Sequence, residues 1–294
     1  MVNYWLDLFT PRTWEEARQR NLCGDFIDQA LRTWHWIQVS ESTGINVSEE
    51  SITDFALLEL QSRHPHEIKT RKFSRYEESL EGADWEWWLT SRNFWLGLRV
   101  QAKKIEPKNL EYPTLDKTNN QGNRQIDLLI DNAIGANPRM IPAYVFYNYW
   151  DLNRLDPEWL CGAYPKTPQL LGCGLSHAMA VRGILLNRSK KLKDLTTVMY
   201  PWSCIVCCRE YSQNGRFDLP YRAFDFLAGA FYNYVKETEF AGYHEEKFVV
   251  REAPSYVYKI MEQEPLSDEE WAKTKANRIV VIIEKSEAAF KSRL

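Results

Sequence analysis

The chain has 294 residues, of which 44% are hydrophobic and 26% are charged, a composition typical of folded proteins and not of disordered ones. Its formal net charge is −3 at pH 7, so contact with nucleic acid would depend on local basic patches and not on the overall field. No basic start followed by an apolar block opens the sequence, and no apolar run reaches the roughly 20 residues that cross a bilayer. We therefore expect a cytoplasmic protein without a signal peptide or a membrane span.

The elements predicted in the first half alternate between helices and strands. Apolar spacing and caps predict helices starting at Thr10, over "GDFIDQALRTWHWIQVSES", from the Ser48 cap to about Arg63, and over 123–133. The expected apolar stripe of the Ser48 helix consists of Ile52, Phe55, Ala56, Leu58 and Leu60 or their neighbours. Strands are predicted at 67–76, 83–90 and 94–105, forming an antiparallel meander, and at 140–148.

The second half has weaker patterns. Helices are expected in "GCGLSHAMAVRGIL", "YRAFDFLAGAFYNYVKETEF" and "SDEEWAKTK", and strands in "LTTVMYPWSCIVCC", "PSYVYKIM" and "RIVVIIEK". The segments "SQNGRFDLP" and 236–252 are expected to be mobile loops. These elements predict a mixed α/β fold, divided into a helical extension (1–44), a core (45–150) and a C-terminal elaboration packed on it (151–294).

The cysteines and histidines favour structural roles. Cys204 and Cys207 form a CxxC pair, but it lies in an apolar run and no second pair completes a tetrahedral zinc set. We therefore expect buried thiols, since free cysteine is among the most buried residue types. His64, like the other histidines in loops and apolar segments, is interpreted as a packed or capping residue.

Two neighbouring predicted strands carry polar side chains on one face. In "GADWEWWL", Asp84, Glu86 and Trp88 alternate with apolar residues, and in "VQAKK", Gln101 and Lys103 do the same. Carboxylate and amide oxygens suit Mg²⁺, while an ammonium group can stabilise the charge that develops on a phosphate during hydrolysis. The pattern therefore indicates a metal-dependent phosphodiesterase site, although an exposed strand face with a snorkelling lysine is the alternative.

The element order and the D…QxK pattern resemble the PD-(D/E)XK nuclease superfamily, and more narrowly the QxK variant of Mrr-like restriction endonucleases. The combination of "EExxT", "GADWEWW" and "VQAK" is also similar to an uncharacterised bacterial family. The resemblance covers roughly residues 45–150 and implies a restriction-endonuclease-like αβββαβ core. It implies a Mg²⁺- or Mn²⁺-dependent endonuclease acting on DNA more readily than on RNA, a homodimer, and a role in antiviral defence.

The same resemblance assigns roles to residues. It implies Asp84, Gln101, Lys103 and a glutamate of the first core helix as catalytic residues. Of the two candidates, Glu49 and Glu50, we prefer Glu50. Asp84 and Glu50 would bind the metal, with Glu86 compensating for the acid that Gln101 replaces.

Nucleic acid would be contacted by Lys104, Lys108, Gln125, Lys72 and Trp88. Trp85 and Trp87 are interpreted as core residues, and Lys72 as equally compatible with an ordinary edge strand. The alternative function is a catalytically inactive nucleic-acid-binding or protein-interaction module, which the missing acid at position 101 favours.

Overall fold

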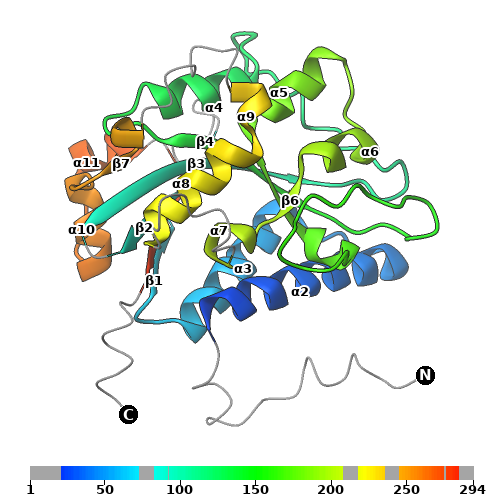
Figure 1. The fold of residues 1–294 in the computed structure, drawn as a ribbon, viewed down its shortest axis with the longest axis horizontal. Coiled ribbons are helices and arrows are strands. Elements are labelled where there is room, and N and C mark those ends of the chain that lie inside the picture. The colour runs from blue at the N-terminus through cyan, green and yellow to red at the C-terminus, as the bar shows by residue number, and fades with distance from the viewer. Residues whose placement is uncertain are drawn as a thin grey trace.

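The computed structural model describes residues 21–72, 83–91, 93–207, 218–235, 245–274 and 276–284. It confirms the mixed α/β class, with one eight-stranded sheet and helices packed around it (Figure 1). The α-helices are α2 (Leu22–Thr43), α3 (Glu49–Arg63), α4 (Gln125–Ile134), α5 (Ala178–Leu186), α6 (Leu192–Leu195), α7 (Cys204–Cys207), α8 (Leu219–Ala230), α9 (Tyr232–Val235), α10 (Ser255–Glu262) and α11 (Asp268–Thr274). The strands are β1 (Ile68–Lys72), β2 (Trp85–Ser91), β3 (Phe94–Lys104), β4 (Ile141–Tyr147), β5 (Cys173–His177), β6 (Tyr200–Pro201), β7 (Val249–Val250) and β8 (Arg278–Ile283). Short 3₁₀ helices lie at η2 (Pro168–Gly172), η3 (Thr196–Val198) and η5 (Glu245–Lys247).

The sheet has the strand order β1-β8-β2-β3-β4-β5-β6, and β7 pairs with β3. Strands β2 and β3 are antiparallel neighbours, as expected, and β4 runs parallel to β3. The expected three-stranded meander is wrong at β1, because β8 lies between β1 and β2. A strand from the C-terminal region therefore belongs to the middle of the sheet.

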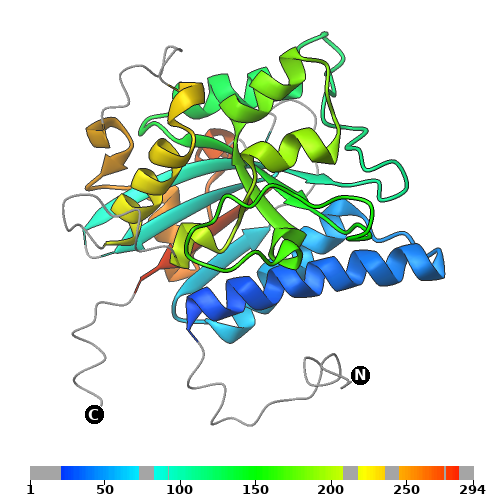
Figure 2. The same ribbon diagram turned by 45° about the vertical axis from the view of Figure 1, so that its right-hand side comes forward.

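Aromatic side chains of β2 divide between the two faces of the sheet. Trp87 lies 6.4 Å from the ring of Phe26 in α2, whereas Trp88 lies 6.2 Å from the ring of Tyr256 in α10. Trp85 and Trp87 are buried, which confirms their assignment to the core. Figure 2 shows α2 along one side of the sheet and the green helices α4 and α5 on the opposite side.

The N-terminal helices α2 and α3 form where their caps and apolar spacing predict them. The Ser48 hydroxyl accepts a hydrogen bond from the Ser51 amide, which starts α3 at Glu49. Ile52, Ala56 and Leu60 of the expected stripe of α3 are buried, whereas Phe55 and Leu58 are exposed and the nearby Thr53 and Leu57 are buried instead. Gly172 lets η2 approach the backbone of α2, away from both ends of that helix, so closely that a Cβ at Gly172 would overlap the Ala30 carbonyl.

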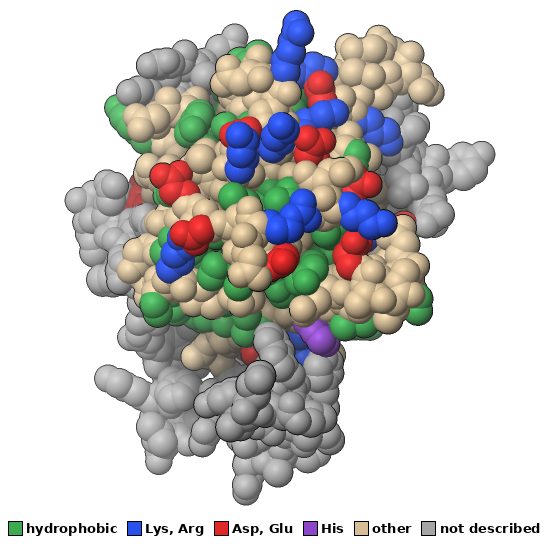
Figure 3. Space-filling view, turned by 90° about the vertical axis from the view of Figure 1, so that its right-hand side faces the viewer, with side chains coloured by type: hydrophobic (Ala, Val, Ile, Leu, Met, Phe, Trp, Pro, Cys, Tyr) green, Lys and Arg blue, Asp and Glu red, His purple; other side chains and the backbone are tan. Residues whose placement is uncertain are grey.

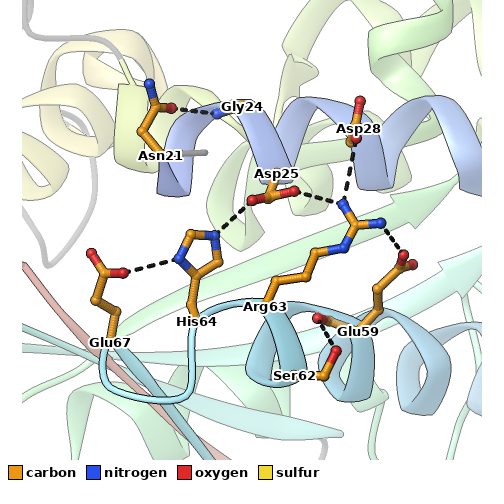
Figure 4. Close-up of polar contacts among 9 residues, drawn as sticks. All are labelled: Asn21, Gly24, Asp25, Asp28, Glu59, Ser62, Arg63, His64 and Glu67. Atoms are coloured by element: carbon orange, nitrogen blue, oxygen red, sulfur yellow. Dashed lines mark hydrogen bonds and ion pairs between the residues drawn. The ribbon is translucent and has the colours of Figure 1, made fainter. Parts of the chain in front are cut away.

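A buried ionic network holds α2 against the C-terminal end of α3 (Figure 4). The imidazole of His64 lies between two carboxylates, with Nε2 2.8 Å from Asp25 Oδ2 and Nδ1 3.0 Å from Glu67 Oε2. The guanidinium group of Arg63 forms ion pairs with Asp25, which also contacts His64, and with Glu59. His64 is thus a packed structural residue, as the sequence indicated.

Several elements of the second half differ from expectation. "PSYVYKIM" forms helix α10 and not a strand, because Tyr256, Val257 and Ile260 are buried at helical spacing. The apolar run around the CxxC pair forms the short elements η3, β6 and α7 instead of one core strand. The segment expected to be one short helix contains strand β5 before α5.

The cysteines only partly match the expectation of buried thiols. Cys161, Cys173 and Cys204 are free and buried, but Cys207 forms a disulfide bond with Cys23. The helix expected at Thr10, the thiol of Cys208, most of "SQNGRFDLP" and residues 236–244 lie outside the described residues.

Candidate active site

The start of β2 and the end of β3 bring Asp84 and Gln101 together. The Asp84 amide donates to the Val100 carbonyl at 2.8 Å, which fixes Asp84 beside β3. Its Oδ2 then accepts hydrogen bonds from the Gln101 side-chain amide and, at 2.7 Å, from the Ala102 backbone amide. The two side chains therefore lie on the same face and in contact, as strand alternation predicts.

Lys103 is the next residue along this face and is only 3% exposed. Its Nζ donates to Gln125 Oε1 at 2.8 Å, so the first residue of α4 holds the ammonium group. The pKa of Lys103 is lowered, because burial outweighs the nearby negative charges of Glu49 and Asp84, which raise it. The structure therefore places Gln125, which was predicted to contact nucleic acid, in direct contact with Lys103.

Glu49, and not Glu50, is the glutamate directed at this group. Glu49 Oε2 accepts a hydrogen bond from the Lys104 backbone amide at 2.8 Å. Burial and the neighbouring Asp84 raise the pKa of Glu49 to about 7, against the opposing effect of Lys103. Glu50 instead pairs with Lys72 at 3.1 Å and with Arg278 at 3.4 Å. The preference for Glu50 over Glu49 is therefore revised.

A cavity of about 310 Å³ opens beside the two carboxylates. It lies between the N-terminus of α3, the start of β2 and the start of β8, and its lining residues are Ser48, Glu49, Glu50, Thr53, Asp84 and Arg278. Gln101 is buried beside Asp84, and its carbonyl oxygen Oε1 has no hydrogen-bond partner in the described part of the chain. A buried acceptor without a donor is unfavourable, so this oxygen is suited to a cation.

Glu86 and Trp88 do not belong to this site. Both side chains are fully buried, and Glu86 accepts hydrogen bonds from Trp88 Nε1 at 3.0 Å and from the Tyr256 hydroxyl at 2.7 Å. Glu86 also pairs with Arg99 at 3.1 Å. Glu86 therefore gives no support to a metal at Asp84, and Trp88 has no exposed ring face on which a base could stack. Within the described residues, no three or more His, Cys, Asp or Glu side chains form a group that could bind a metal ion.

The basic residues predicted to contact nucleic acid lie in different environments. Lys72 pairs with Glu50 and, at 2.5 Å, with Asp54, whereas Lys104 donates to Asn46 Oδ1 and to the Val47 carbonyl. Lys108 is exposed. On the face shown in Figure 3, Lys and Arg side chains alternate with Asp and Glu and form no continuous positive surface. Lys72 and Lys104 are therefore engaged in contacts within the protein, whereas the side chain of Lys108 is exposed to solvent.

Three residues that line the cavity, Ser48, Thr53 and Arg278, were not predicted as site residues from the sequence. Arg278, at the start of β8, is remote in sequence, and no sequence pattern indicated it. Glu49 was a candidate that was not preferred, although it lies three and four residues before the buried Ile52 and Thr53 and so shares their face of the helix.

The structure contains no helix, among its described residues, that is long and apolar enough to cross a membrane. Comparison with curated proteins and with solved structures gave no match. The model of a family of unknown function, DUF6615, matches residues 22–288, which include every residue of the candidate site. The chain therefore belongs to the DUF6615 family.

Proposed function

We propose that the protein is a metal-dependent nuclease that hydrolyses nucleic-acid phosphodiester bonds, with DNA favoured over RNA as the substrate to be expected. The observation that carries the proposal is the convergence of Asp84, Gln101, Lys103 and Glu49, contributed by β2, β3 and α3, beside one cavity. In the resemblance drawn from the sequence, the same Asp, Gln and Lys are the residues that carry the reaction.

The residues present fit Mg²⁺ or Mn²⁺. Asp84, Glu49 and Gln101 offer oxygen atoms, the ligand type that these hard cations prefer, and Gln101 Oε1 lacks a protein donor among the described residues. These three residues would bind the cation, with Glu49 in the place first assigned to Glu50. When bound, such a cation lowers the pKa of water and neutralises charge on the phosphate.

The side chains of the protein have distinct tasks around that cation. Lys103, held by Gln125, places a positive charge beside the carboxylates, where it stabilises the negative charge that develops on the phosphate oxygens. The Ala102 amide and the Gln101 amide hold Asp84 in one orientation. The Lys104 amide does the same for Glu49. The carboxylates are therefore positioned before any ligand binds, which favours catalysis.

The partner of Lys103 supports an active site over an inactive one. An inactive module would be expected to neutralise its buried lysine by a direct ion pair with Asp84. Here Lys103 Nζ donates to the neutral side chain of Gln125 at 2.8 Å. By the same resemblance, the proposal extends to a homodimer that acts in bacterial antiviral defence in the cytoplasm.

Cleavage assays with the full-length protein test the proposal. Supercoiled plasmid, single-stranded DNA and RNA are each incubated with the wild type and with Lys103→Ala, in the presence and absence of Mg²⁺ or Mn²⁺. We expect metal-dependent cleavage by the wild type, and a rate reduced about 100-fold or more by the substitution, since losing one charge-stabilising group typically has this effect.

The matched control is Lys193→Ala, which removes an exposed lysine of α6. It should cleave like the wild type. Equal cleavage by all three proteins would place the activity elsewhere or in a contaminant. An absence of cleavage with every substrate would favour the binding module.

A further inference from the structure

A second cavity, of about 520 Å³, lies on the sheet face that carries Glu86 and Trp88. It is bounded by β2 and β3, by the C-terminal end of α4 and the loop after it, and by the N-terminus of α10. Its apolar walls include Trp88, Met140, Ala136 and Pro254, and Arg99, Asn132 and Ser255 contribute polar groups. None of its lining residues belongs to the cavity beside Asp84.

The centre of this second cavity is a buried guanidinium group. Arg99 is 3% exposed and borders the cavity. Its Nη2 contacts Glu86 Oε1 at 3.1 Å and the Thr274 carbonyl at 3.5 Å. Its other nitrogens, Nε and Nη1, are buried and have no hydrogen-bond partner among the described residues. Arginine has five N–H donors and no acceptor, so most of its capacity to bind an anion is unused here.

Glu86 satisfies Arg99 only in part, because its second oxygen is already occupied. Glu86 Oε2 accepts from Trp88 Nε1 and from the Tyr256 hydroxyl, which orients the carboxyl group away from the remaining guanidinium nitrogens. Complete burial also raises the pKa of Glu86, which weakens it as a counter-charge to Arg99. An additional acceptor from outside the protein would therefore meet an unsatisfied donor group.

The N-terminus of α10 adds a second feature that favours negative charge. Pro254 and Ser255, the cap and first residue of this helix, both line the cavity, and unpaired amides at a helix N-terminus attract anions. The exposed Asp131 at the other side of the cavity is the one acidic residue among its described lining. At the buried end of the cavity, where Arg99 lies, the positive charge of Arg99 and the N-terminus of α10 therefore favour an anion more than the exposed Asp131 disfavours it.

The apolar walls determine the shape of a ligand. The indole of Trp88 crosses over β3 because its neighbour in register is Gly97, where a Cβ would lie 3.0 Å from both Trp88 and Met140. The closed end of the cavity is therefore built from a buried indole and a buried thioether, close to the ring of Tyr256. The accessible apolar wall consists of the partly exposed Ala136, Pro138 and Pro254, which can contact the apolar body of a ligand.

We propose that this cavity is a binding site for a small organic anion, a carboxylate or phosphate monoester carried on a planar apolar body. The anionic group would approach Arg99 and the N-terminus of α10, and the apolar body would lie against Ala136, Pro138 and Pro254, which are the partly exposed apolar residues of the lining. A volume of about 520 Å³ is within the range of small-molecule sites. The proposal does not depend on nuclease activity, because it shares no residue with the proposed catalytic group.

Calorimetric titration of the full-length protein tests the proposal. The probes are benzoate, phenyl phosphate, inorganic phosphate and the neutral benzamide. We expect saturable binding of benzoate or phenyl phosphate at least about tenfold tighter than binding of benzamide, which corresponds to one charge-assisted contact. The two anionic probes distinguish a carboxylate site from a phosphate site, and inorganic phosphate shows whether the ring is required.

A pair of variants locates the binding. Ala136→Trp places a bulky side chain in the cavity and leaves Glu86 and Arg99 unsubstituted, whereas Ala136→Ser leaves the space open. We expect the first to abolish binding and the second to preserve it. Arg99→Gln removes the positive charge and should therefore remove the preference for the anion, provided that its circular dichroism spectrum matches the wild type. Failure of both anions to bind, equal binding of benzamide, or unchanged binding to Ala136→Trp would each overturn the proposal.

Discussion

The charge state of Glu49 and Lys103 at the candidate site depends on their burial and on the charged groups next to them. Glu49 and Lys103 each favour the charged form of the other, whereas burial disfavours the charged form of both. Asp84 is held by two amides, which fix the orientation of its carboxyl group. A cation at this position would compete with the proton of Glu49.

Metal affinity should depend on pH through Glu49. Its pKa is raised to about 7, so below that pH the carboxyl group must lose a proton before it can bind the cation. We expect the affinity for Mn²⁺, measured by electron paramagnetic resonance, to rise about tenfold between pH 6 and pH 8. Glu49→Gln should bind more weakly and lose this pH dependence.

The matched control is Glu50→Gln, at the neighbouring position, which should retain the pH dependence of the Mn²⁺ affinity. Its carboxylate is engaged by Lys72 and Arg278 at the wall of the cavity. If instead Glu50→Gln abolished the pH dependence and Glu49→Gln preserved it, the assignment of the two glutamates would be reversed.

At the level of single elements, prediction succeeded where one periodicity dominated. Helices α2, α3 and α4 and strands β2, β3, β4 and β8 follow their expected segments. Helix α10 was expected to be a strand because Tyr256, Val257 and Tyr258 favour strands by residue type, but tertiary packing of Tyr256, Val257 and Ile260 prevails. The choice between Glu49 and Glu50 failed because it depends on helix phase, which requires the correct buried stripe.

The attachment of α2 to α3 should weaken in alkaline solution. The carboxylates of Asp25 and Glu67 raise the pKa of His64 to about 9, from an ordinary value near 6.5, against the effect of burial. The charged imidazole therefore contributes stability below pH 6.5 that is lost as the pH rises through about 9. The contribution is on the order of 3 kcal/mol.

Urea unfolding of the wild type and of His64→Gln measures this contribution. The variant should be less stable at pH 6, and the difference in the free energy of unfolding should shrink by pH 10. A difference that stays constant from pH 6 to pH 10 would contradict a charged His64.

At the scale of the whole molecule, the sheet joins segments from both ends of the described chain. Strand β8 lies between β1 and β2, so the C-terminal region completes the core and does not merely cover it. This insertion was not predictable from the sequence, because strand order depends on long-range pairing that residue patterns do not encode. Glu86 and Arg99 face each other on the predicted neighbours β2 and β3, but the burial of this pair under Tyr256 of α10 was not predictable, since Tyr256 is remote in sequence.

Removal of β8 should therefore abolish folding. A protein truncated after residue 276 loses the buried Ile279, Val280, Val281 and Ile282 and exposes the edges of β1 and β2. We expect it to lack a cooperative thermal transition and to have lost near-ultraviolet circular dichroism. A cooperative transition like that of the full chain would show that β8 is dispensable.

The most direct test of the account is binding of Mn²⁺ to the wild type and to Asp84→Asn at pH 8, because it requires no knowledge of the substrate. The substitution keeps the size of the side chain and removes the charge nearest to Gln101. Asp156→Asn, which alters an exposed aspartate, is the control. We predict that the wild type and the control bind the ion at one site and that Asp84→Asn binds it at least about tenfold more weakly. Equal binding by all three proteins, or none by the wild type, would contradict a metal site at Asp84.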